Sequence, residues 1–322
     1  RAVTHALAYS GYVEIIPTPF MSNTVLDTWG LDADDPRRNT VAVQNPLDAD
    51  YAVLATTLLP AMLEAVGRNV ARGRHDLSLY SVAQTAEKTA DESPMPSVAE
   101  RPSDAVVEEL VSSLPVQHLH AATVAIGNIE PEGPWGDGRA YTWADAIESA
   151  QVVARACGVT LDIESVEHLP WHPGRCAQLS VDGVVVGYAG ELHPQVLEVL
   201  GLPERTCAME IDLTAVPFNQ TLPAPVLSSF PALHQDIALV VDEAVPAESV
   251  RRTIEQNAGD LLEAVELFDV YRSESLGDGK KSLAFGLIFR AADRTLTDDE
   301  ASAGRLAAAE AVAKEFGAQM RA

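Results

Sequence analysis

The order of strands and helices expected after residue 232 constrains the fold of this chain more than any other feature of its sequence. The spacing of apolar residues predicts, in order, a strand at 236–242, a helix at 245–259, strands at 261–272 and 280–290, a helix from 297, and a short edge strand at 317–322. The second helix opens with Thr-Asp-Asp-Glu, which has the spacing of a capping box. This βαββα(β) order is that of a ferredoxin-like domain.

The strand predicted at 280–290 has two very different faces. Its large residues are Leu283, Phe285, Leu287 and Phe289, and they alternate with Ser282, Ala284 and Gly286. In the preceding strand, Phe268 and Val270 suit a core. Asp269 and Tyr271 alternate with them and suit solvent. Both helices of such a domain cover one face of the sheet. We therefore expect an open face that gathers Ala238, Asp269, Tyr271, Ser282 and Gly286.

An open sheet face of this composition fits single-stranded RNA. The ring of Tyr271 offers a stacking surface, polar side chains can read base edges, and small residues permit close approach. Basic residues near the rim are candidates for phosphate contacts, namely Arg272, Lys280, Lys281, Arg290 and Arg294. A second interpretation stays open, in which the face is solvated and the basic residues are incidental.

The charge of the chain limits its partners. Its 322 residues include 47 Asp and Glu against 22 Lys and Arg, for a formal net charge of −25. This acidity opposes broad nonspecific binding of nucleic acid, although it leaves room for a local site. The sequence has no apolar run near the ~18 residues of a membrane span, so we expect a cytoplasmic protein without membrane contact. We expect Cys157, Cys176 and Cys207 to be buried or free thiols of a reducing compartment.

The length of the chain predicts two domains. Residues 218–229 contain prolines and show no periodicity, so they are predicted to link a domain at 1–217 to a domain at 230–322. Because Arg1 falls inside a helical pattern, we interpret the chain as part of a longer polypeptide.

The first domain combines one-sided helices with strands. Helices predicted at 58–72 and 142–157 each have an apolar face that needs a core or a partner. Asp182-Gly183 separates two alternating apolar runs, which is typical of a hairpin with a two-residue turn. Strands joined in this way are antiparallel.

Several sequence blocks carry a family resemblance. FPALHQDIALVVDEAVP, LLEAVELFDVYR and LGDGKKSLAFGLIFRAADRTLTDDE resemble the C-terminal anticodon-binding domain of bacterial phenylalanine–tRNA ligase beta subunits. Upstream, GYVEIIPTPF, QNPLDADYAVLATTLLPAMLEAVGRN, LPWHPGRCAQL and VGYAGELHP follow the order of the catalytic-like module of the same subunit. The resemblance covers nearly the whole chain.

The resemblance implies an α+β protein, with a class II synthetase-like antiparallel sheet module followed by the ferredoxin-like βαββα(β) domain. It implies a heterotetramer of two alpha and two beta subunits, in which alpha performs the chemistry with ATP and Mg²⁺ and this chain binds no cofactor. It also implies contacts with the tRNA(Phe) anticodon at positions matching Ala238, Asp269, Tyr271 and Ser282. The alternative is a stand-alone RNA-binding or scaffold protein built from the same modules.

Two positions depart from the family pattern. Gln235 stands where arginine is common, which would remove a phosphate contact, and Ala55 replaces the arginine of the common LRTSLLP. The first domain also lacks the Gly-x-Gly-x-x-Arg run of class II catalysis. We therefore expect it to have no catalytic residues.

The histidines of the first domain do not predict an active or metal site. His118 and His120 are interpreted as surface residues. His168, His172 and Cys176 lack a fourth ligand at a spacing that suits zinc. We therefore expect no metal site.

Overall fold

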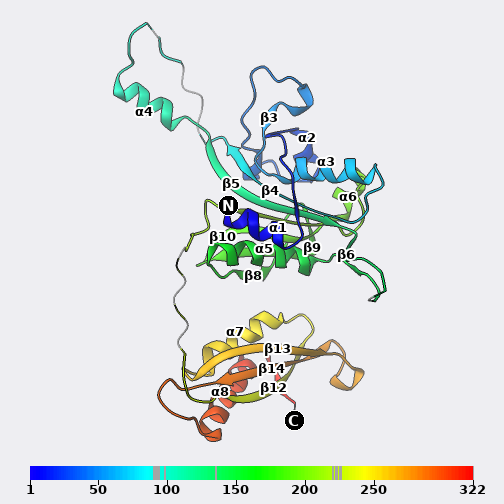
Figure 1. The fold of residues 1–322 in the computed structure, drawn as a ribbon, viewed down its shortest axis with the longest axis vertical. Helices are drawn as coiled ribbons and strands as arrows, with labels where there is room; N and C mark the ends of the chain where they lie inside the picture. The colour runs from blue at the N-terminus through cyan, green and yellow to red at the C-terminus, as the bar shows by residue number, and fades with distance from the viewer. Residues whose placement is uncertain are drawn as a thin grey trace. The chain divides into compact units, whose positions relative to one another are not determined.

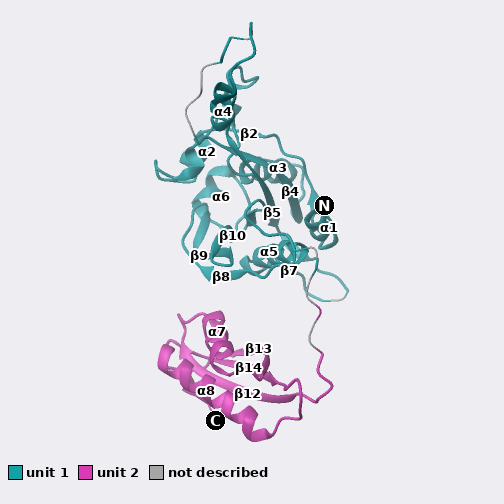
Figure 2. Cartoon of the chain, turned by 90° about the vertical axis from the view of Figure 1, so that its left-hand side faces the viewer, with its two compact units in different colours: residues 1–222 teal, residues 223–322 magenta. Residues whose placement is uncertain are grey.

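The computed structural model divides the chain into two units (Figure 2). Unit 1 comprises residues 1–222 and unit 2 comprises residues 223–322. The structure describes residues 1–89, 95–97, 99–134, 136–219, 221, 224 and 227–321. Parts of the linker predicted at 218–229 therefore lie outside the described residues.

Unit 1 is built on a seven-stranded sheet (Figure 1). In spatial order its strands are β1 (Val13–Glu14), β4 (Leu77–Glu87), β5 (Val116–Ile126), β11 (Cys207–Asp212), β10 (Val184–Leu192), β9 (Trp171–Val181) and β8 (Asp162–Ser165). The pair β1–β4 is parallel, and the other neighbouring pairs are antiparallel. Smaller elements are β2 (Phe20–Met21), β3 (Val53–Leu54), β6 (Asn128–Glu130), β7 (Arg139–Ala140), α2 (Thr24–Thr28) and α4 (Asp104–Ser112).

Helices cover both faces of this sheet (Figure 1). The helices α3 (Leu59–Val70) and α6 (Pro194–Leu200) pack on one face, whereas α1 (Ala2–Tyr9) and α5 (Trp143–Cys157) pack on the other. The apolar faces of α3 and α5 are buried in these two cores. Both helices predicted from periodicity therefore find their packing surface within unit 1.

The hairpin at Asp182-Gly183 and the helix predicted at 142–157 are both confirmed in unit 1. Asp182 and Gly183 have φ angles of 51° and 79°, so both central residues of the β9–β10 turn are left-handed, as a type I′ hairpin requires. Helix α5 begins with a capping box between Thr142 and Asp145 and ends at Gly158, whose φ is 72°.

Unit 2 has the predicted ferredoxin-like order. Its elements are β12 (Leu233–Asp242), α7 (Ala247–Asn257), β13 (Leu262–Tyr271), β14 (Lys280–Phe289), α8 (Asp298–Phe316) and β15 (Gln319–Met320). The sheet order is β13-β14-β12-β15, with antiparallel neighbours. The large residues of β14 share a core with Val250 and Ile254 of α7 and with Ala308 and Val312 of α8. Both helices therefore cover the same face of the sheet.

The first turn of α8 gives a test of this local structure. Thr297 Oγ1 accepts from the Glu300 amide at 3.4 Å, and the Glu300 carboxylate accepts from the Thr297 amide at 3.0 Å. Thr297→Ala is expected to destabilise unit 2 by about 1 kcal/mol because it removes this cap. Faster hydrogen exchange of the first α8 amides would report the loss, and unchanged exchange would contradict it.

Candidate nucleic-acid interface

The sheet of unit 2 has a second face, opposite α7 and α8. On this face, the register aligns Ala238 with Ala284 and Asp269 in one row across three strands. The adjacent row aligns Val240, Ser282 and Tyr271. The structure therefore brings together all four residues that the resemblance implied, on β12, β13 and β14.

The prediction that Phe268 and Val270 lie in the core is wrong. The pairing of β13 with β14 shifts register between Leu267 and Asp269, so Phe268 is the extra residue of a β-bulge. Leu267 packs against the core, whereas Phe268 is 60% exposed and Val270 is 38% exposed. Strict alternation of side chains along a strand does not predict the exposure of Phe268, because the extra residue of the bulge shifts which side chains face the core.

Ser282 also differs from the expectation of an accessible small residue, since it is only 3% exposed. Arg321 passes over this part of the sheet. Its amide donates to the carbonyl of Ala238 on β12 at 2.8 Å, and its guanidinium carbon lies 5.2 Å from the ring centroid of Tyr271 on β13. Because β12 and β14 lie between β15 and β13, the side chains of Arg321 and Tyr271 reach toward each other across these two strands, and β14 carries Ser282. A base that stacks on Tyr271 must displace Arg321 or share the ring with it.

Sequence reasoning missed Arg321. The signal was present, because an edge strand was expected at 317–322. Its pairing partner was not predicted, and only the observed pairing of β15 with Leu239 and Val240 places Arg321 beside Ala238.

The five predicted phosphate-contacting cations already have partners within unit 2. The contacts are Arg272 with Glu243 at 2.7 Å, Lys280 with Asp242 at 2.8 Å, Arg290 with Glu263 and with the carbonyl of Phe230, Arg294 with Glu300 at 2.6 Å, and Lys281 with the carbonyl of Glu243 at 2.8 Å. The rim position expected for Lys281 is wrong, because it lies on the same side as Leu283 and is buried. The other four are exposed or half-buried, and their contact with RNA remains a prediction.

Gln235 does not face the open side of the sheet. Its side chain donates to Ser302 Oγ at 3.2 Å and accepts from Arg305 Nε at 2.9 Å, and both partners belong to α8. The idea that this substitution removes a phosphate contact therefore finds no support in its position.

Unit 1 contains a cavity of about 270 Å³ on its central sheet. Two histidine–carboxylate pairs line it: His118 Nδ1 lies 2.6 Å from Asp212, and His120 Nδ1 lies 2.7 Å from Glu210. The interpretation of His120 as a surface residue is wrong, since its ring is largely buried against Glu210. The two partners lie 90 residues apart in sequence and meet only because β5 pairs with β11.

Glu210 is the centre of a buried polar cluster. Besides His120, it accepts from the Thr57 hydroxyl and from the Leu58 amide at 2.9 Å. Burial raises the pKa of Glu210, but the bonds from His120, Thr57 and Leu58 outweigh it and hold that pKa below its usual value. Burial lowers the pKa of His120, but the hydrogen bond and charge of Glu210 outweigh it and leave that pKa raised. Both shifts favour the charged forms of His120 and Glu210.

The remaining walls of this cavity do not suggest nucleotide chemistry. Arg37 is the one arginine among the described lining residues, and it is held by Asp35 and the carbonyl of Leu169, each at 2.7 Å. The rings of His168 and Tyr188 stack with their centroids 3.7 Å apart. Burial lowers the pKa of His168 to about 4, so its ring is neutral. Ala55, the other departure from the family pattern, is buried in the adjacent core.

The cysteines offer no reactive thiol. Cys157, Cys176 and Cys207 are buried and free of disulfides. Burial raises the thiol pKa of Cys176 and that of Cys207 to about 12. Within the described ranges, no three His, Cys, Asp or Glu side chains gather as a metal site would require. Among the helices of the described chain, none is both long and apolar enough to cross a bilayer.

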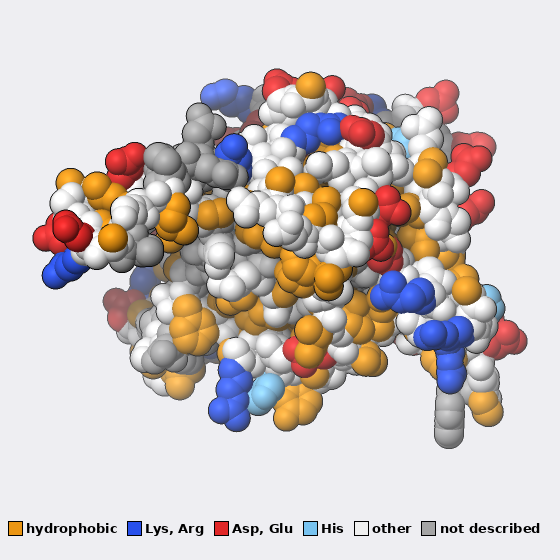
Figure 3. Space-filling model, turned by 90° about the horizontal axis from the view of Figure 1, so that it is seen from above, with side chains coloured by type: hydrophobic (Ala, Val, Ile, Leu, Met, Phe, Trp, Pro, Cys, Tyr) orange, Lys and Arg blue, Asp and Glu red, His pale blue; other side chains and the backbone are white. Residues whose placement is uncertain are grey.

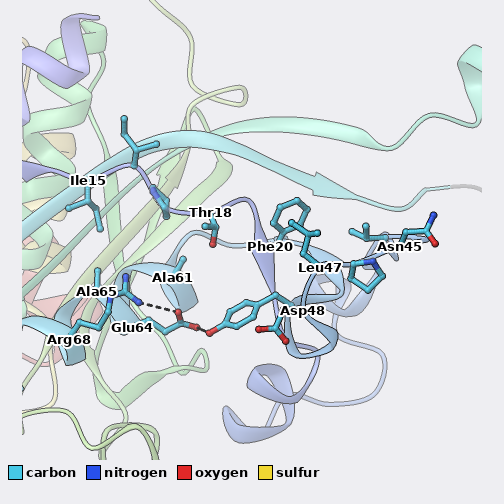
Figure 4. Close-up of a pocket in the computed structure, with 15 residues that line it drawn as sticks. Ile15, Thr18, Phe20, Asn45, Leu47, Asp48, Ala61, Glu64, Ala65 and Arg68 are labelled. Carbon is cyan, nitrogen blue, oxygen red and sulfur yellow. Dashed lines mark hydrogen bonds and ion pairs between the residues drawn. The ribbon is translucent and has the colours of Figure 1, made fainter.

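A larger cavity of about 590 Å³ lies between the segment at 15–20, the loop at 43–51 and α3 (Figure 4). Its rim is apolar and exposed, since the side chains of Ile16 and Leu47 are almost fully accessible to solvent. One wall is polar, where the Tyr51 hydroxyl donates to Glu64 at 3.0 Å and Arg68 approaches the same carboxylate (Figure 4). On the face of the molecule in Figure 3, basic and acidic side chains are interspersed around hydrophobic ones.

Comparison with known proteins identifies both units. Residues 1–213 match the family model described as the phenylalanyl tRNA synthetase beta chain CLM domain. Residues 228–321 match the ferredoxin-fold anticodon binding domain. Together they define a tRNA synthetase chain with an anticodon-binding domain.

Similar proteins identify the family within this class. The phenylalanine–tRNA ligase beta subunits of Corynebacterium efficiens and Corynebacterium glutamicum are each 67% identical to the chain over 322 residues, and that of Nocardia farcinica is 52% identical over 323 residues. Each alignment covers 100% of this chain and 39% of the relative. The chain therefore belongs to the phenylalanine–tRNA ligase beta-subunit family, and it spans about two fifths of the length of these relatives. A solved pyrrolysyl-tRNA synthetase from Desulfitobacterium hafniense aligns with 12% identity and a TM-score of 0.45 over 66% of the chain and 64% of that chain, which is too weak for argument.

Proposed function

We propose that this chain is a non-catalytic portion of the beta subunit of a phenylalanine–tRNA ligase. Unit 2 binds the anticodon of tRNA(Phe), and unit 1 is a class II synthetase-like module that holds the alpha subunit. The observation that carries the proposal is the alignment of Ala238, Asp269, Tyr271 and Ser282 in two adjacent rows of a domain that matches an anticodon-binding family. The antiparallel pairs of the unit 1 sheet support the class II assignment, although the parallel pair β1–β4 departs from an all-antiparallel sheet.

In this proposal the complete cytoplasmic enzyme is a heterotetramer of two alpha and two beta subunits. The alpha subunit supplies the site that uses ATP and Mg²⁺. The cavity around Glu210 is consistent with this division, because its one described arginine is occupied by Asp35 and Leu169. The domain limits that we propose are 1–217 and 230–322, joined by a linker at 218–229.

Reconstitution tests the proposal. A complete beta subunit that contains this chain, mixed with alpha, should charge tRNA(Phe) with phenylalanine. The chain alone should show no ATP–pyrophosphate exchange. Robust exchange by the chain alone would contradict a non-catalytic role, and failure to bind alpha under any condition would favour a stand-alone RNA-binding protein.

We further propose that the apolar cavity of Figure 4 receives a side chain of the alpha subunit. Exposed apolar residues such as Ile16 and Leu47 around a well-formed hollow are typical of protein interfaces. Leu47→Asp is expected to weaken association with alpha at least about tenfold, or ~1.4 kcal/mol, because it places a charge in the interface. Val199→Asp, at another exposed apolar residue of unit 1, is the control. Equal affinities of both variants for alpha, measured by sedimentation, would remove this cavity from the interface.

A further inference from the structure

Phe268 is an aromatic side chain for which neither the core nor the four expected anticodon contacts account. It is 60% exposed, and it occupies the bulge of β13 on the open face of unit 2. Bulges re-aim side chains and concentrate next to functional sites. On a sheet face proposed to bind RNA, an exposed phenylalanine is a candidate stacking surface for an unpaired base.

The ring of Phe268 lies beside a notch in the sheet. A Cβ atom built on Gly286 would be 3.8 Å from Phe268 Cδ1 and 3.8 Å from Asp236 Oδ1. The ring and the carboxylate therefore flank the same glycine, one from β13 and one from β12. Because Gly286 has no side chain, the backbone between Phe268 and Asp236 is uncovered, and a flat ligand can approach it closely.

The chemistry around this notch favours a base over a phosphate. The rows beside Phe268 carry Asp236, Glu266 and Asp269, all of them exposed carboxylates that repel phosphate oxygens. A carboxylate accepts hydrogen bonds from the exocyclic amino groups of cytosine, adenine or guanine, which uracil lacks. An aromatic face with a carboxylate at its edge therefore fits an unpaired, amino-bearing base.

The notch is also distinct from the position over Tyr271. Gly286 and Ser282, which pairs with Tyr271, are four residues apart on β14. A strand advances about 3.4 Å per residue, so the two positions are about 14 Å apart. A stacked strand advances about 3.4 Å per nucleotide. One base cannot serve both positions, and two bases can do so only in a splayed loop.

We propose that Phe268 and Asp236 form a second base-binding position, which takes an amino-bearing nucleotide of the anticodon loop other than the one over Tyr271. This inference rests on the proposed anticodon-binding function. It assigns Phe268 the role of stacking platform and Asp236 the role of acceptor for the base amino group.

The test uses the complete ligase and tRNA(Phe). Phe268→Ala is expected to weaken tRNA binding between about fivefold and thirtyfold, whereas Phe268→Tyr should stay close to wild type because it keeps the ring. Phe218→Ala, at a phenylalanine of similar exposure (56%), should have no effect. A series of tRNAs, each with one abasic nucleotide in the anticodon loop, then locates the partner of each ring. One abasic position should cancel the effect of Phe268→Ala, and a different one should cancel that of Tyr271→Ala.

Asp236→Asn supplies a further readout. With wild-type protein, replacing the amino-bearing base over Phe268 by uridine should weaken binding, and in Asp236→Asn this loss should shrink. Equal losses in both proteins would contradict the role of Asp236.

The other outcomes separate the inference from the function on which it rests. If Tyr271→Ala weakens binding and Phe268→Ala does not, the second position is refuted and the anticodon face stands. If neither variant changes the affinity, the proposed function itself fails. If a single abasic nucleotide cancels both effects, the face has one base position only. A Phe268→Ala ligase that loses assembly with alpha, yet binds every abasic tRNA as wild type does, would show that the ring contacts protein instead of RNA.

Discussion

Replacing Glu210 by alanine is expected to lower the free energy of unfolding of unit 1 by about 3 to 5 kcal/mol. The substitution leaves His120, the Thr57 hydroxyl and the Leu58 amide without their shared acceptor in a buried position. Denaturation followed by tryptophan fluorescence measures this, since all four tryptophans of the sequence, at positions 29, 135, 143 and 171, fall within residues 1–222.

A matched control separates the buried cluster from an ordinary ion pair. Glu148→Ala breaks an exposed pair with Arg155, and it should change the free energy of unfolding by less than about 0.5 kcal/mol. Similar losses in the two variants would mean that Glu210 has no special role in stabilising unit 1.

The loss on Glu210→Ala should also depend on pH. His120 has a raised pKa in the folded state, so its contribution is complete below the unfolded value of 6.5 and fades as pH rises through the folded pKa. Glu210 has a lowered pKa, so its contribution is complete above the unfolded value of 4.5 and fades as pH falls through the folded pKa. The destabilisation should therefore be largest between about pH 4.5 and 6.5. A loss that keeps growing above this window would contradict the charged pair.

Replacing Tyr271 by alanine is expected to weaken binding of tRNA(Phe) to the complete ligase by about 1 to 3 kcal/mol, because a base loses its stacking partner. Tyr271 is 42% exposed and lies under the guanidinium of Arg321, so its ring is both reachable and already used as a stacking surface. Filter binding or fluorescence anisotropy at a fixed salt concentration measures the change.

Two further variants define what Tyr271 contributes. Tyr271→Phe keeps the ring and should bind nearly as well as wild type. Tyr9→Ala removes an exposed tyrosine of unit 1 and should leave the affinity for tRNA unchanged. A loss in Tyr271→Phe as large as that in Tyr271→Ala would assign the effect to the hydroxyl instead of the ring.

The periodic parts of the fold could be predicted from the sequence. The alternation of Leu283, Phe285, Leu287 and Phe289 and the capping box at Thr297 are local signals, and both are confirmed. The segment at residues 11–20 is less regular, since only Val13–Glu14 pair with β4 and Pro17 and Pro19 have no amide hydrogen to donate to a strand.

Several features of the candidate site could not be predicted from local sequence patterns. The bulge at Phe268 cannot be recognised from a strand pattern, because one extra residue turns the rest of β13 over. The pairs formed by His120 with Glu210 and by Arg321 with Tyr271 join residues that are distant in sequence, so only the strand order brings them together.

The central claim is that the open face of unit 2 binds the anticodon. The most direct measurement compares wild-type and Tyr271→Ala ligase for their affinities toward two RNAs, namely intact tRNA(Phe) and tRNA(Phe) with three abasic anticodon nucleotides. The account predicts that Tyr271→Ala weakens binding of the intact tRNA and leaves that of the abasic tRNA unchanged. Equal weakening toward both RNAs, or none toward either, would contradict it.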